Sequence, residues 1–110
     1  MTHLHSHENI WVDTDGDGQI EALSRTASEL LGVAAAHGQN LFLFFRDDPA
    51  SVARDVEIAR TGWPTARTVL LEPLTRQPVP VRYTVGPRYG ASGTGLHWSF
   101  DTDCPRAAVH

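Results

Sequence analysis

The clearest periodic pattern of apolar positions lies between residues 18 and 37. Apolar side chains recur there at the spacing of one helix face, at Ile20, Leu23, Ala27, Leu30, Leu31 and Ala34. Gly38 follows, and glycine often ends a helix because it adopts the left-handed conformation without steric cost. The pattern therefore predicts one long amphipathic helix over about residues 18–37.

Other segments have the alternation or the β-branched and aromatic composition of strands. These segments are residues 9–12, 66–71, 77–85 and 96–101. Pro80 cannot donate a hydrogen bond to a ladder, so the strand at 77–85 is expected to begin at a sheet edge. Residues 40–46 contain an uninterrupted apolar run, which is typical of a central strand covered on both faces.

The segment from residue 49 to 61 has two interpretations. Asp48 and Pro49 fit an N-cap followed by proline at the first helical position, which predicts a second helix. Apolar and polar residues also alternate over residues 52–60, so a strand fits nearly as well. We favour the helix slightly and keep both possibilities open.

Composition fits one small globular domain. The chain has 110 residues, of which 41% are hydrophobic and 20% charged, and it contains neither an internal repeat nor a linker. We expect residues 9–101 to form a single α+β domain, with a mostly antiparallel sheet of four or five strands. The long helix should lie on one face of this sheet, and residues 1–8 and 102–110 should be flexible.

Charge and cysteine content narrow the choice of partners and compartment. The net charge is −4 and the nine basic residues are scattered, so no basic face is available for nucleic acid. Cys104 is the only cysteine, which excludes an intramolecular disulfide and suits a reducing compartment. Residues 1–8 lack the apolar core of a signal peptide, and the longest apolar run, 41–45, is too short to cross a bilayer. These features predict a soluble, cytoplasmic protein.

The most specific chemical signal is the acidic stretch at residues 13–21. It contains Asp13, Asp15, Asp17 and Glu21 at alternate or nearby positions around Gly18. Hard cations such as Ca²⁺ bind oxygen ligands presented in this way. Residues 13–24 resemble the calcium loops of EF-hand and dockerin domains. The resemblance implies that the four acidic residues are the metal ligands, and it covers none of the rest of the chain.

Two features separate this stretch from an EF-hand. Ser24 stands where the closing bidentate carboxylate belongs, and residues 9–12 predict a strand where an EF-hand has its incoming helix. Loss of that carboxylate lowers the expected calcium affinity to about millimolar. The acidic residues also suit a helix N-terminus, with Asp17 as the N-cap. We favour this capping interpretation over a calcium site.

A small enzyme is a further alternative. His97 and Asp101 alternate along one predicted strand, and with the glycine-rich segment 86–95 they could line a pocket. Polar alternation is equally typical of any strand that faces solvent. The segment 86–95 lacks lysine and leads into a strand, so it predicts a hairpin connection rather than a phosphate-binding loop.

The preferred function is therefore a non-catalytic small interaction protein, such as a regulatory, accessory or toxin-neutralising partner. No catalytic motif is assembled in the sequence, and three aromatic residues lie beside predicted turns, where such residues often anchor interfaces. They are Trp63, Tyr89 and Trp98. We expect a protein partner, no membrane partner, and no cofactor other than a possible weakly bound Ca²⁺. The sequence does not specify the partner or the oligomeric state.

Overall fold

The fold is built on one antiparallel sheet of five strands. The computed structural model describes residues 9–32, 39–46, 49–73, 77–90 and 93–102. The sheet order is β2-β1-β5-β4-β3, so the first strand of the chain pairs with the last at the centre. The strands are β1 (Ile10–Asp15), β2 (Ile20–Leu23), β3 (Thr65–Leu71), β4 (Val79–Gly90) and β5 (Gly93–Asp101).

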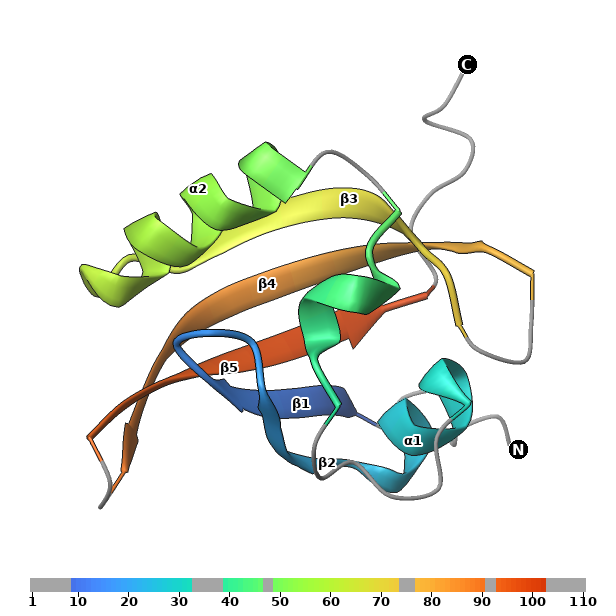
Figure 1. Cartoon of the computed structure of the whole chain (residues 1–110), viewed down its shortest axis with the longest axis horizontal. Helices are drawn as coiled ribbons and strands as arrows, with labels where there is room; N and C mark the ends of the chain where they lie inside the picture. Colours follow the sequence, from blue (N-terminus) through green and yellow to red (C-terminus); the bar gives the residue numbers. More distant parts are fainter. Residues whose placement is uncertain (1–8, 33–38, 47–48, 74–76, 91–92, 103–110) are drawn as a thin grey trace, which may run out of the picture.

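Two α-helices and a short 3₁₀ helix cover one face of this sheet. They are α1 (Arg25–Leu31), η2 (Leu41–Phe44) and α2 (Pro49–Arg60). Figure 1 shows α2 beside β3 and β4, and α1 beside β1 and β2. Apolar residues of all three helices and of the strands form a single buried cluster. The predicted class, a small α+β domain with a mostly antiparallel sheet, is confirmed.

The two faces of the sheet differ in exposure. On β4, Val81, Tyr83 and Val85 are fully buried, whereas the intervening Arg82 and Thr84 are exposed. On β5, Ser99 is exposed in the same way between core residues. This alternation is the signature of a sheet with one face on the core and the other in solvent. We call the exposed side the open face.

The prediction of a helix over residues 18–37 is wrong at its start. Residues 20–23 form β2, and α1 begins at Arg25 because Ser24 is the N-cap, accepting from the N–H of Ala27 at 3.1 Å. Gly32 ends the helix with φ 79°, before residues that lie outside the described part of the chain. Apolar residues of both β2 and α1 face the same core, so their spacing in the sequence matched one helix face although a strand and an N-cap occupy its first part.

The predicted central strand at 40–46 is also wrong. Residues 41–44 form η2, and Asn40 is its N-cap, with a side chain that accepts from the N–H of Phe42 at 2.9 Å. Leu43 is 81% exposed while Leu41 is fully buried, so this apolar run does not lie between two covered faces. An uninterrupted apolar run indicates burial but does not determine the backbone conformation.

The remaining predictions have mixed outcomes. The helix interpretation of residues 49–61 is confirmed by α2, which buries Val52, Val56 and Ala59. All four predicted strand segments are present. The segment 86–95 belongs to a hairpin, as predicted, but most of it lies within the two paired strands, because β4 continues to Gly90 and β5 begins at Gly93. Residues 1–8 and 103–110 lie outside the described residues, so flexible termini stay a prediction.

Candidate functional site on the open face

The acidic stretch forms the turn of a β-hairpin between β1 and β2. One carboxylate oxygen of Asp15 accepts hydrogen bonds from the backbone N–H groups of Asp17 and Gln19, both at 2.9 Å. Gly18 has φ 90°, and a Cβ there would lie 2.8 Å from the ring of Phe42, so only glycine suits this position. The capping interpretation is therefore wrong: Asp17 does not cap a helix, and Asp15 stabilises a turn.

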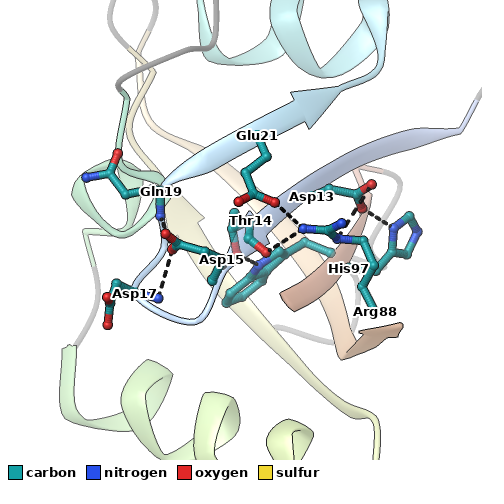
Figure 2. Close-up of polar contacts among 9 residues, drawn as sticks. Asp13, Thr14, Asp15, Asp17, Gln19, Glu21, Arg88 and His97 are labelled. Atoms are coloured by element: carbon teal, nitrogen blue, oxygen red, sulfur yellow. Dashed lines mark hydrogen bonds and ion pairs between the residues drawn. The ribbon is translucent and has the colours of Figure 1, made fainter. Parts of the chain in front are cut away.

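Arg88 of β4 forms the centre of a polar cluster on the open face (Figure 2). Its guanidinium donates to the carbonyl oxygen of Thr14 at 3.2 Å and to the carboxylate of Glu21. Its Nε lies 3.9 Å from a carboxylate oxygen of Asp13. The side chain crosses β5 at Gly95, where a Cβ would lie 2.6 Å from the guanidinium. The arginine thus ties together β4, β1 and β2.

His97 of β5 completes this cluster. Its Nδ1 lies 2.5 Å from Asp13 Oδ1, and its ring stacks on Trp11 with centroids 6.0 Å apart. A histidine held by a carboxylate is one part of a nucleophilic site, which also needs a hydroxyl or thiol within reach of the histidine. Among the described residues, no serine or threonine hydroxyl is hydrogen-bonded to His97, whose side chain is 47% exposed. The geometry is that of a surface ion-pair network.

The four predicted calcium ligands are not gathered around one point. Asp13 and Glu21 contact Arg88, whereas Asp15 accepts from the turn backbone and Asp17 is exposed. Within the described ranges, no group of three or more His, Cys, Asp or Glu side chains is arranged to hold a metal ion. In this conformation the acidic residues act as partners of Arg88, His97 and backbone N–H groups.

The three predicted interaction residues have different environments. Trp63 is 71% exposed in the turn that precedes β3, so it is accessible to a partner. Trp98 is fully buried, and its indole N–H donates to the Thr14 hydroxyl at 3.0 Å. Its side chain therefore belongs to the core and does not form part of the surface. Tyr89 lies on β4, and its side chain is outside the described part.

Trp98 belongs to an aromatic cluster that fills the space between the sheet and the helices. Its ring centroid lies 5.1 Å from that of Tyr83 and 5.7 Å from that of Phe45. The rings of Phe45 and Tyr83 are 5.5 Å apart. These are distances of direct ring contact.

A buried ion pair between Asp55 and Arg67 was not predicted from the sequence. Asp55 of α2 is only 4% exposed and accepts from Arg67 of β3 at 2.7 and 3.1 Å, and from the Tyr83 hydroxyl at 2.6 Å. A signal for it exists in the sequence, because Asp55 follows Val52 by three residues and precedes Ala59 by four. That spacing places a carboxylate on the apolar face of the helix, where it must have partners.

The electrostatics of this pair are set by burial and by hydrogen bonding. Burial by itself raises the pKa of Asp55, but the hydrogen bonds from Arg67 and Tyr83 and the charge of Arg67 outweigh it, so the pKa lies below its ordinary value of 3.8. Burial raises the pKa of Tyr83, and the hydrogen bond to the Asp55 carboxylate raises it further. Asp55 is therefore ionised and Tyr83 protonated at neutral pH.

The comparisons with known proteins bear on the fold. No family model matches the chain, and no curated protein matches it. Solved structures do match. The PAS domain of an HTR-like protein from Haloarcula marismortui aligns with a TM-score of 0.72 at 13% identity, covering 86% of this chain and 80% of that one. The fold is PAS-like.

Two further structures agree with this assignment. A PAS domain from Desulfitobacterium hafniense aligns with a TM-score of 0.73 at 10% identity, covering 92% of this chain and 99% of that one. The light-state structure of the blue-light photoreceptor Aureochrome1 LOV gives a TM-score of 0.75 at 18% identity, covering 96% and 90%. Similarity at this level of identity establishes the fold alone. In the described part of the chain, no helix is long and apolar enough to cross a membrane.

Proposed function

We propose that this chain is a non-catalytic regulatory module that acts in the cytoplasm by binding a partner protein through the open face of its PAS-like sheet. One observation carries the proposal: all described helices pack on the other face, and the open face has no described element over it. A sheet of five strands, with one face that none of the described helices covers, offers a broad and rigid surface.

The chemistry of the open face suits a protein partner. Its central charged groups are paired with one another, since Arg88 contacts Asp13 and Glu21. A partner that covers paired charges has less desolvation energy to overcome than one that covers isolated charges. The stacked pair of Trp11 and His97 supplies an aromatic element of the kind that anchors interfaces.

Trp63 lies near this surface, in the turn just before the start of β3. The next residue, Pro64, packs against Gly86, because a Cβ at Gly86 would lie 3.7 Å from the Cβ of Pro64. Gly86 lies between Thr84 and Arg88, which lie on the open face of β4. A partner that covers this end of β4 would therefore have Trp63 within reach as a second anchor.

The structural neighbours support a regulatory role. One is the PAS domain of the nitrogen regulation protein NR(II) from Vibrio parahaemolyticus, and another is the photoreceptor Aureochrome1 LOV. Both names describe proteins that respond to a signal. A non-catalytic module of the same fold would fit such a role.

A charge placed in the middle of the open face tests the proposal. Ser99 is exposed there, beside Thr84 and opposite Trp11. Ser99→Arg should abolish the capture of a specific partner, which wild type and the control Ala53→Arg, on the exposed side of α2, should retain equally. With the purified partner, Ser99→Arg should raise the Kd about tenfold or more.

Two results would overturn the proposal. One is equal partner affinity for wild type and Ser99→Arg, with the variant folded by circular dichroism. The other is a chain that captures no protein but whose melting temperature rises with a small molecule.

A further inference from the structure

The two edge strands of the sheet, β2 and β3, differ in how far other backbone segments pair with their outward side. At the β2 edge, the N–H of Ile20 donates to the Gln39 carbonyl at 2.9 Å, and the N–H of Leu41 donates to the Gly18 carbonyl at 2.8 Å. The strand is also short, at four residues, and its register with β1 shifts next to Thr14. Short length, irregular register and a covering segment are the usual protections of an edge strand.

At the β3 edge only the C-terminal half is covered. The N–H of Arg46 donates to the Leu70 carbonyl at 3.0 Å, and the N–H of Glu72 donates to the Phe44 carbonyl at 2.7 Å. The backbone groups of alternate residues point to the same side of a strand. The N–H and C=O groups of Ala66 and Thr68 therefore point outward along the same edge.

The outward N–H and C=O groups of Ala66 and Thr68 lack the features that usually keep an edge strand from pairing with another chain. Among the described residues, nothing forms a hydrogen bond with them, and the register of β3 with β4 is regular throughout. The side chains of Ala66 and Thr68 are exposed and uncharged. Arg67 is the only charged residue of β3, and its Nε donates to a carboxylate oxygen of Asp55 at 2.7 Å. Its charge therefore does not protect the edge from pairing with another strand. Helix α2 packs mainly over β4, and no described backbone group pairs with this half of the edge.

We propose that a second copy of this chain adds its own β3 antiparallel to this edge, joining the two sheets into one. A two-fold axis beside Ala66 would let both copies contribute the same outward donors and acceptors, as a self-complementary interface requires. Since each β2 edge is covered at its start by residues 39–41 and is only four residues long with an irregular register, the joined sheet would have no second long, regular edge of this kind. The assembly would therefore close as a dimer and would not grow into a fibre.

The side of α2 that faces β3 favours a second copy of this chain, and not an unrelated peptide, as the partner of the β3 edge. Asp55 reaches Arg67, so this flank of the helix is turned towards β3. Ile58 follows by three residues and lies on the same flank, and it is one of few large apolar side chains left exposed among the described residues, at 38%. The two-fold axis would bring the α2 helices side by side, so that each Ile58 is covered by the partner.

Ile58→Arg tests the interface without altering the strand. Analytical ultracentrifugation over a range of concentrations should show a monomer–dimer equilibrium for wild type, with a dimer Kd about tenfold or more weaker for Ile58→Arg. The control is Ala53→Arg, because residue 53 lies about 140° around the helix from residue 58 and is exposed. It should dimerise like wild type.

Two more measurements sharpen the test. Ala66→Pro removes one outward N–H while the neighbouring residues keep their ladder with β4, so it should also weaken the dimer. The amides of Ala66 and Thr68 should exchange hydrogen more slowly as protein concentration rises. Ser99→Arg should leave the dimer intact, which separates this proposal from partner binding on the open face. A chain that stays monomeric at millimolar concentration, or a dimer unchanged by Ile58→Arg, would overturn it.

Discussion

Asp55 connects α2 to the sheet, and its replacement by alanine gives a quantitative test of the buried network. The substitution removes the acceptor of the Tyr83 hydroxyl, which is fully buried. Leaving this hydroxyl without a partner costs about 1–3 kcal/mol. The Arg67 side chain is 36% exposed, so water replaces its lost partner and the loss of that pair adds only about 0.5–1 kcal/mol. We expect a total loss of about 1.5–4 kcal/mol in the free energy of unfolding.

Urea unfolding followed by circular dichroism measures this loss, and a double-mutant cycle identifies its origin. Tyr83→Phe removes the hydroxyl itself, so Asp55→Ala added to that background leaves no unpaired group on residue 83. The double variant should therefore be more stable than the sum of the single losses implies, by about 1 kcal/mol or more. Strict additivity, or a loss below about 0.5 kcal/mol for Asp55→Ala, would refute the view that the hydroxyl depends on this carboxylate.

Three further predictions concern pH, packing and capping. The pKa of Asp55 is lowered from 3.8, so the stability that Asp55 contributes should be lost as pH falls below 3.8. The pKa of Tyr83 is raised from 10.0, so the stability that Tyr83 contributes should be lost as pH rises above 10.0. Urea midpoints measured across pH should show both declines, and Asp55→Asn should make the acidic one smaller. Gly95→Ala should displace Arg88 and lower the unfolding free energy by about 1–3 kcal/mol; an unchanged urea midpoint would contradict the contact. Ser24→Ala should cost about 1 kcal/mol by removing the α1 cap, and a loss smaller than about 0.3 kcal/mol would show that water replaces the hydroxyl.

Four of the five strands could be predicted from the sequence, because their residues alternate or are β-branched and aromatic, whereas β2 was predicted as part of a helix. Val79, Val81, Tyr83 and Val85 alternate with polar residues, and the structure buries the last three completely. The helix start could not be predicted in the same way. Ile20 lies on β2 and Leu31 on α1, and both face the same core. Their spacing in the sequence matches one helix face only by coincidence. Ser24 was the decisive residue, because it accepts from the N–H groups of both Trp11 and Ala27.

The open-face cluster was beyond the reach of sequence patterns. Arg88 and Glu21 are 67 residues apart in the chain, and His97 and Asp13 are 84 apart. Only the strand order brings them together, since β5 lies between β1 and β4. The acidic residues were found, but their partners depended on which strands become neighbours. A local pattern specifies residue types and does not specify that order.

The pairing of β1 with β5 at the centre of the sheet has a mechanical consequence. The strands are antiparallel, and Ile10, near the start of β1, lies opposite Phe100, near the end of β5. Tension applied to the chain at Asn9 and Thr102 would therefore pull this first pair apart across its hydrogen bonds. The bonds of the ladder would break one after another instead of sharing the load. A stretching force at these two points would split the sheet through its middle, separating the β1–β2 hairpin and α1 from the three-stranded remainder.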